Sequence, residues 1–251
     1  MCPERLGLGY GMDGGCTDYV KIRGDLLSRN PNALFHIPDN VSFDEAAILD
    51  PICNAYKAVV QESSILPGED IAVFGVGPLG LFSIQIARVM GCGNIIAIGL
   101  SGDKDRFEIA KKYGATHVIA SDEQDLFAEM DRITGGEKVP VVIDAAGVNS
   151  VLKQAIQIVR KGGEIIKIGF DKRPYGDSLD ELLDLGITLK GHFGYDYVSW
   201  KNVLHLLELG KVDLKGMISH HIRLEDWSRG FDLVRSKKAI KIIISKDEPK
   251  L

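Results

Sequence analysis

The chain has 251 residues, 45% hydrophobic and 26% charged, and its formal net charge at pH 7 is −5. This size suits one large or two modest globular domains, and mild acidity without a block of like charge excludes a nucleic-acid-binding surface. No stretch reaches the roughly 20 apolar residues of a membrane helix, the start lacks a secretory signal, and four scattered cysteines form no disulfide framework, so we expect a soluble cytoplasmic protein.

Residues 1–51 predict irregular β structure, because glycine-rich turns at 9–15 are followed by polar–apolar alternation at 16–22. From residue 52 onward, short apolar runs alternate with helical patterns. The expected strands are 70–74, 94–98, 117–120, 139–143, 164–168 and 187–190, and the expected helices between them are 79–90, 105–113, 123–132 and 151–159. Continuous apolar strands separated by helices are typical of a parallel sheet covered on both faces. Residues 52–195 therefore predict a doubly wound α/β domain.

The carboxy-terminal residues 196–251 return to a different pattern. They predict two helices, 200–209 and 224–234, and a closing strand, 240–244. We expect them to pack with residues 1–51, so that the parallel sheet is inserted into a second domain made from both ends of the chain.

A glycine-rich turn follows the first strand of the expected sheet, with the sequence Gly75-Val76-Gly77-Pro78-Leu79-Gly80. It matches the GxGxxG fingerprint in its required context between a strand and a helix. The first glycine makes the tight turn, the second lets the backbone approach a pyrophosphate, and the third lets the helix pack closely. These six residues, hereafter the glycine turn, therefore predict a dinucleotide site. A glycine turn of another α/β class, such as a methyltransferase, is the alternative.

The ribose-binding position departs from that fingerprint. An acid about 20 residues further on would bind the ribose 2′-OH of NAD, but the strand ends there in Gly99 and Ser101, with no carboxylate. Loss of the acid removes a repulsion against a 2′-phosphate, which Ser101 and Arg106 could receive. The sequence leans slightly toward NADP, with Asp103 as a ribose ligand of NAD as the alternative.

Three later strand ends are expected at the same edge of the sheet. Ligands of such sheets lie beyond the carboxyl ends of the strands. Small residues follow the fourth and fifth strands, and His192 and Phe193 follow the sixth, where backbone groups could meet a nicotinamide amide. The further cofactor-binding residues predicted on this basis are Ala145, Ala146, Gly147, Ile168, Gly169, His192 and Phe193.

Together these segments resemble the zinc-containing medium-chain dehydrogenase/reductase family, which includes alcohol, polyol and threonine dehydrogenases. Residues 14–20 are similar to its GGFAEYV motif and 44–51 to its EEAA-LEP motif, and further matches follow in order along the chain, at 66–70, 111–115, 160–163 and 238–244. The resemblance implies a Rossmann domain, residues 52–195, inserted in a partial GroES-like catalytic domain, residues 1–51 and 196–251. It also implies hydride transfer between a secondary alcohol and NAD or NADP.

The resemblance also implies two catalytic positions. The segment from Asp50 to Ala55 looks closest to the DPxxNA stretch of threonine and polyol dehydrogenases. It would place Asp50 at or near the catalytic zinc and Asn54 beside the nicotinamide. From the residues alone, Asp50 could instead be a helix-cap or turn carboxylate, and Asn54 an ordinary polar residue of a helix.

The zinc ligands themselves are incomplete in the sequence. A catalytic zinc needs three protein ligands, no Gly-His-Glu motif is present, and Cys2 lacks the partner cysteines of the family's structural zinc lobe. We therefore expect a chain without the amino-terminal zinc-binding segment, which binds cofactor but is inactive by itself.

Two other functions remain open from the sequence: a non-catalytic NAD(P)-binding or interaction subunit, and a zinc-free reductase of the same superfamily. The expected substrate is a small alcohol, and a sugar alcohol, an amino alcohol and a simple diol are equally compatible. We expect a homo-oligomer, a dimer or tetramer, with residues 178–185 as a candidate contact.

Overall fold

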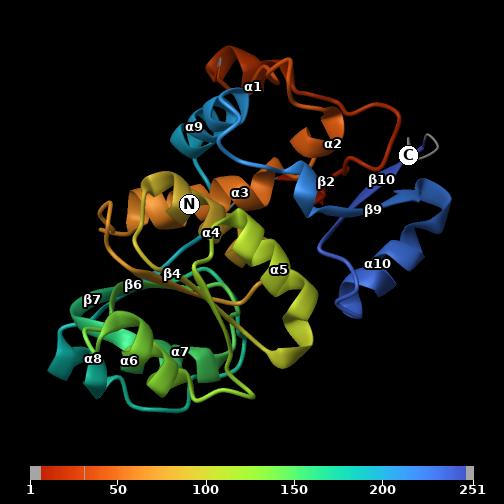
Figure 1. Cartoon of the computed structure of the whole chain (residues 1–251). Helices are drawn as coiled ribbons and strands as arrows, with labels where there is room; N and C mark the ends of the chain where they lie inside the picture. The colour runs from red at the N-terminus through yellow and green to blue at the C-terminus, as the bar shows by residue number, and fades with distance from the viewer. Residues whose placement is uncertain (1–6, 31, 247–251) are drawn as a thin grey trace.

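The computed structural model describes residues 7–30 and 32–246, and its centre is a six-stranded parallel sheet with the order β5-β4-β3-β6-β7-β8 (Figure 1). The strands are β3 (Ile71–Phe74), β4 (Ile95–Gly99), β5 (His117–Ala120), β6 (Val139–Asp144), β7 (Val159–Lys167) and β8 (Thr188–Gly191). Because β3 pairs with both β4 and β6, the strand order reverses at β3, which makes this the switch point where such sheets bind ligands. The predicted doubly wound sheet is confirmed.

Helices cover both faces of this sheet (Figure 1). Successive side chains of β3 point to opposite faces, so Ile71 and Val73 lie in one core, and Ala72 and Phe74 lie in the other. The first core is completed by α3 (Leu49–Tyr56), α4 (Pro78–Met90) and α5 (Lys104–Tyr113), and the second by α6 (Leu126–Thr134), α7 (Asn149–Ile158) and α8 (Asp180–Leu185). All four side chains of β3 are buried, which is why its sequence is continuously apolar.

The helix ends follow the local signals in the sequence. α4 begins with Pro78 in its first turn and ends at Gly91, which has a left-handed backbone with φ 78°. α5 ends in the same way at Gly114, with φ 118°. The Asp125 side chain accepts hydrogen bonds from two backbone N–H groups and so caps the amino-terminal end of α6. The helix therefore starts three residues later than the periodicity predicts.

The two ends of the chain pack together, as the sequence predicts. The amino-terminal part holds β1 (Gly7–Leu8), β2 (Gly11–Met12), α1 (Gly24–Arg29) and α2 (Phe43–Ala46), and the carboxy-terminal part holds α9 (Tyr197–Glu208), β9 (Ile218–Arg223), α10 (Trp227–Arg235) and β10 (Lys241–Ser245). The Asn40 side chain donates to the Leu207 carbonyl at 3.0 Å, and the His221 ring lies 3.0 Å from Asp44. Figure 1 shows these red and blue segments side by side.

The irregular β structure predicted for residues 1–51 is largely wrong. The described part contains two strands of two residues each, whereas residues 16–22 form bends and coil, and α1 and α2 are helical. Alternation sets which way side chains face, but a strand also needs a neighbouring edge to pair with. α3 crosses the expected boundary at residues 51/52 and packs on both α4 and α9, so the domain limits stay a prediction.

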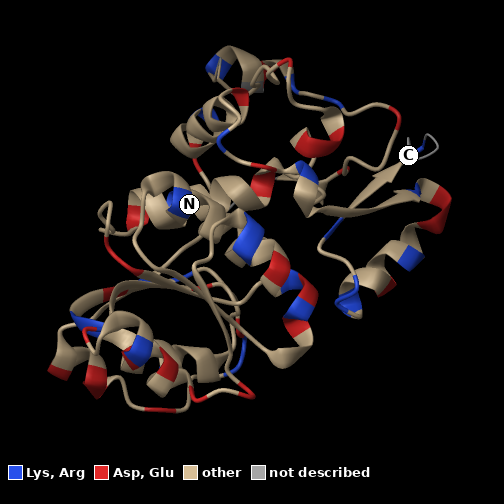
Figure 2. Ribbon diagram, viewed as in Figure 1, with Lys and Arg blue, Asp and Glu red and all other residues tan. Residues whose placement is uncertain are grey.

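The surface carries mixed charge. Acidic and basic residues are interspersed along the same elements, as on α5, where Lys111 pairs with Glu108 at 2.7 Å (Figure 2). None of the helices in the described residues is long and apolar enough to cross a membrane. In the expected oligomer contact, Leu182 and Leu185 pack on the core, and Leu183 of α8 is 80% exposed. The oligomeric state stays a prediction.

Candidate functional site

The glycine turn folds tightly between β3 and α4. Gly75 has φ +88°, and a Cβ there would lie 2.9 Å from the Ala146 nitrogen at the end of β6. A Cβ on Gly80 would lie 1.7 Å from the Gly75 carbonyl oxygen. Neither position tolerates a side chain, because main-chain atoms already occupy the space. These two glycines shape the turn itself.

Gly77 differs from both of its neighbours in the turn. It has an ordinary negative φ, and a Cβ on it would meet no atom within 4 Å. It also precedes the first turn of α4, whose N–H groups have no partners inside the helix and favour an anion. Val76 is buried beneath the turn, so only its backbone faces this space. The turn therefore leaves open room where the main-chain N–H groups of Gly77, Leu79 and Gly80 could hold a diphosphate, since Pro78 has no N–H.

The ends of β4 and β5 meet at a carboxylate that the sequence interpretation missed. The Ser101 N–H and hydroxyl both donate to Asp122, each at 2.7 Å, and these bonds hold the pKa of Asp122 below its usual range. Because β4 and β5 are adjacent parallel strands, residues just beyond them share one edge, and this is the signal that could have found Asp122. A carboxylate does lie at the edge where the sequence predicts the ribose, and the neighbouring strand supplies it.

The remaining residues predicted to select the cofactor already have protein partners. The Arg106 guanidinium donates to the main-chain carbonyls of Lys237 at 3.3 Å and Ala239 at 3.1 Å. The Asp103 carboxylate accepts from the Leu100 N–H at 3.1 Å. Arg106 thus ties α5 to the segment before β10. A Cβ on Gly99, at the end of β4, would crowd the Phe107 ring at 3.1 Å.

The ends of β6 and β7 approach each other closely. A Cβ on Gly169 would lie 2.3 Å from the Gly147 nitrogen, and one on Gly147 would lie 2.6 Å from the Phe170 nitrogen. Main-chain contact therefore accounts for both glycines without a ligand. Ala145 and Ala146 continue directly from β6 beside the glycine turn, and Ile168 is buried beyond β7. All five lie at the predicted edge, and their cofactor role stays a prediction.

An ion pair with a fully buried carboxylate connects the ends of β6 and β7. Asp144, at the end of β6, is fully buried, and its carboxylate accepts from Lys167 Nζ at 2.8 Å and from the Gly147 N–H at 2.9 Å. The pair joins the last residues of β6 and β7. It was not predicted, because Asp144 reads in sequence only as the end of an apolar run.

A second group of polar residues joins α3 to the end of β8. The Asn54 side chain donates to the Asp50 carbonyl at 2.9 Å and to its carboxylate at 3.1 Å. The His192 ring is buried, with Nε2 3.2 Å from the Asn54 side-chain oxygen and Nδ1 2.6 Å from the Glu62 carboxylate. The structure thus brings three of the predicted residues together and adds Glu62. Phe193, beyond His192, packs edge-on against Phe170.

This group does not fit a zinc ion by itself. Within residues 7–30 and 32–246, no three His, Cys, Asp or Glu side chains gather as a metal site. Asp50 lies in the first turn of α3, exposed, and burial raises the pKa of the nearby Cys53 thiol well above its usual range, which opposes a thiolate ligand. Cys2 lies outside the described residues. The described residues alone therefore do not supply a zinc site.

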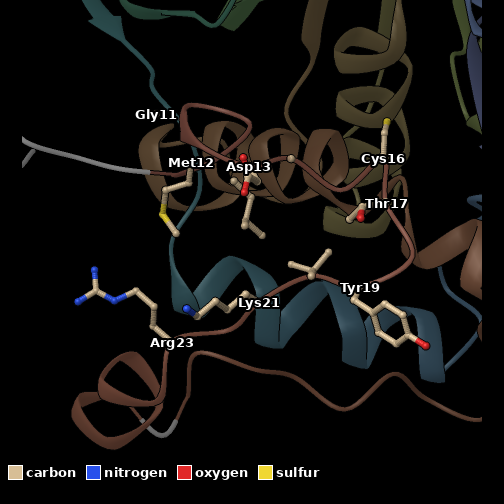
Figure 3. A pocket seen from close by; sticks show the side chains of 11 residues that line it. Gly11, Met12, Asp13, Cys16, Thr17, Tyr19, Lys21 and Arg23 are labelled. Carbon is tan, nitrogen blue, oxygen red and sulfur yellow. The ribbon is translucent and has the colours of Figure 1, made fainter.

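Two pockets lie away from the sheet edge. One, of about 720 Å³, is formed by residues between 8 and 23, with Met12 and Asp13 on one side and Lys21 and Arg23 on the other (Figure 3). The second, of about 590 Å³, lies between residues 30–37 and α9 and has aromatic walls. Neither contains a residue of the glycine turn.

Comparisons with known proteins agree with the fold. Residues 78–208 match the family model described as zinc-binding dehydrogenase. The chain is 42% identical over 250 residues to the uncharacterized zinc-type alcohol dehydrogenase-like protein YdjL of Escherichia coli K12, covering 98% of this chain and 70% of that protein. It is 33% identical to L-threonine 3-dehydrogenase of Bacillus velezensis, covering 97% and 68%.

A solved structure gives the same result. The 2R,3R-butanediol dehydrogenase of Bacillus subtilis superposes with a TM-score of 0.82 at 30% identity, covering 94% of this chain and 66% of that one. The chain therefore belongs to the zinc-binding dehydrogenase family, and the family resemblance read from the sequence is confirmed. It spans about two thirds of the length of these relatives. Dependence on NAD(P) and on zinc is expected for this family.

Proposed function

We propose that this chain binds a nicotinamide dinucleotide and belongs to an enzyme that transfers hydride between a secondary alcohol and the nicotinamide. The observation that carries the proposal is the glycine turn, where Gly77 leaves open space before the amides of α4 while Gly75 and Gly80 hold the turn closed. When bound, the cofactor supplies the ring that accepts the hydride. Two of the relatives named above are an L-threonine 3-dehydrogenase and a 2R,3R-butanediol dehydrogenase, which supports a small alcohol as substrate.

The protein's own contribution at this site is binding and orientation. The main-chain N–H groups of Gly77, Leu79 and Gly80 would hold the diphosphate. The Ser101–Asp122 pair would face the adenosine ribose, and the ends of β6 to β8 would line the nicotinamide half. All of these residues follow the carboxyl ends of strands in the same parallel sheet, where ligands of such sheets bind.

The direct test is titration of the chain with NADH, followed by tryptophan fluorescence and by the unfolding temperature. We expect saturable binding and a rise in the unfolding temperature, because a ligand that binds only the folded state stabilises it. An unchanged unfolding temperature at saturating NADH and NADPH would contradict the proposal. Binding without turnover of any alcohol, with zinc supplied, would favour the non-catalytic alternative. Turnover in the presence of a chelator would favour the zinc-free one.

Among the two cofactors, we propose that NAD is preferred, which reverses the lean of the sequence. The support is that the Asp122 carboxylate already holds both donors of Ser101, where a 2′-phosphate would have to bind. Two anions would then compete for the same donors and repel one another. The Arg106 guanidinium is held by two carbonyls through Nη2, and its charge faces the Asp103 carboxylate at 3.9 Å, so it is already partly balanced.

The substitution Asp122→Asn tests this choice. It removes the negative charge and keeps an acceptor for Ser101, so affinity for NADPH should rise about tenfold relative to NADH. Glu108→Gln is the matched control, because it removes one negative charge from α5 at an exposed pair with Lys111. It should leave the NADPH-to-NADH affinity ratio unchanged. A shift caused by Asp103→Asn alone would instead assign the ribose to Asp103, the sequence alternative.

A further inference from the structure

Both ring nitrogens of the buried His192 face oxygen atoms. Nδ1 lies 2.6 Å from a carboxylate oxygen of Glu62, and Nε2 lies 3.2 Å from the side-chain oxygen of Asn54. Only 3% of the His192 side chain is exposed, so water does not compete for these bonds. A neutral imidazole has one N–H donor and one acceptor nitrogen. An amide oxygen can only accept, so its place at Nε2 requires a proton on that nitrogen, unless Asn54 can turn its amide around.

The orientation of the Asn54 amide is fixed from the other side. Its NH₂ group donates to the Asp50 carbonyl at 2.9 Å and to the Asp50 carboxylate at 3.1 Å, and both of these oxygens can only accept. Turning the amide around would place its oxygen against two acceptors and lose two hydrogen bonds. The network is consistent only when Asn54 presents its oxygen to the ring, and Nε2 of the ring donates to it.

The Glu62 carboxylate that contacts His192 lies at the end of a π-helical turn. Residues Lys57–Glu62 follow α3 as a π-helix, a rare form that is frequent at functional sites. Its wider turn brings Lys57 and Glu62, five residues apart, onto one face with 3.6 Å between the charged groups. Lys190 of β8 donates to the Glu62 carbonyl, and Lys57 also reaches the Phe193 carbonyl. The charged groups around the ring are thus Glu62, Lys57 and Lys190, with Asp50 beyond Asn54.

We propose that His192 is a positioning residue of the candidate site. Bonded to Glu62 through Nδ1 and donating to Asn54 from Nε2, it bridges these two side chains, and through Asn54 it holds the Asp50 carboxylate at the carboxyl edge of the sheet. The chain of contacts runs from the π-helix Lys57–Glu62 through the loop after β8 to the first turn of α3, and the ring is its buried centre. This inference rests on the proposed function only in assigning that edge to the nicotinamide half of the cofactor.

The first test needs no cofactor. ¹⁵N NMR of the histidine rings in the folded chain should show a proton on Nε2 of His192. The exposed His205 is the matched control, because its Nδ1 also faces a carboxylate, Glu208, at 3.1 Å. His205 should exchange its protons rapidly with water. A His192 ring with an unprotonated Nε2 would overturn the proposal, whatever the cofactor results.

The second test separates the two halves of the cofactor. His192→Gln carries both of its donors on a single nitrogen, so it cannot contact Glu62 and Asn54 with a nitrogen at each end. It should lower affinity for NADH about tenfold and leave affinity for ADP-ribose, which lacks nicotinamide, unchanged. His205→Gln should change neither affinity. Equal NADH binding by His192→Gln and the parent chain would overturn the positioning role. If the parent chain binds neither ligand, the proposed function fails, and the assignment to the nicotinamide half fails with it. In that case the NMR result still tests the hydrogen-bond network around His192, because the measurement needs no cofactor.

Discussion

Replacing Gly77 by alanine is expected to weaken NADH binding by about 10- to 100-fold while the fold keeps its stability. The added methyl group meets no protein atom within 4 Å and sits on a backbone with φ −78°, which alanine adopts freely. It would project into the open space in front of α4, where the diphosphate must approach the main-chain amides. Fluorescence titration with NADH gives the affinity, and urea unfolding gives the stability, which should change by less than about 1 kcal/mol.

Two other glycines serve as controls for that result. Gly80→Ala would place its Cβ 1.7 Å from the Gly75 carbonyl oxygen, so α4 must move, and we expect more than about 3 kcal/mol of destabilisation. Gly24→Ala, at the start of α1 in open surroundings, should change neither property. If Gly77→Ala bound NADH like the parent chain, the diphosphate would not lie at the glycine turn.

The sheet could be predicted because its signals are local. β3 is buried on both faces, so its residues are all apolar, and Gly91 and Gly114 end α4 and α5 where the sequence places glycines. The expected strand at 117–120 coincides with β5. β7 begins at Val159, five residues early, because that residue pairs with Val139 across a register shift. A pairing of this kind between distant segments leaves no periodicity to read.

The amino-terminal part could not be predicted for the same reason. Alternation at residues 16–22 is compatible with a strand, but no partner strand lies beside it in the described structure. The π-helical turn at Lys57–Glu62 continues the apolar pattern of α3, and nothing in its composition distinguishes it from an α-helix. Its effect is visible only in the distant contact that it creates.

In the candidate site, too, features set by neighbouring residues could be predicted, whereas contacts between distant residues could not. The glycine turn is a constraint within six residues, so the sequence alone indicates it. Ser101 and Asp122 are 21 residues apart, and His192 and Glu62 are 130 apart, so their pairing depends on the order of the strands. Ser101 and His192 were predicted from the sequence as site residues. Their partners, Asp122 and Glu62, could be identified only from the fold.

The buried pair beneath the sheet edge gives the other large expected effect. Lys167→Met should destabilise the fold by about 3 to 5 kcal/mol, because it leaves the fully buried Asp144 carboxylate without its counter-ion. The remaining Gly147 N–H at 2.9 Å cannot compensate a full charge. Urea unfolding measures the loss, and NADH affinity should fall as well, since Gly147 touches the end of β7 through Gly169.

A double variant distinguishes charge from packing. Asp144→Asn with Lys167→Met removes both charges and keeps an acceptor for the Gly147 N–H, so most of the lost stability should return. Lys153→Met breaks the pair with Asp177, in which both side chains are about half exposed, and should have no measurable effect. If the double variant were as unstable as Lys167→Met alone, the aliphatic packing of Lys167 between the strands would explain the loss. The ion pair would then not be what holds the ends of β6 and β7 together.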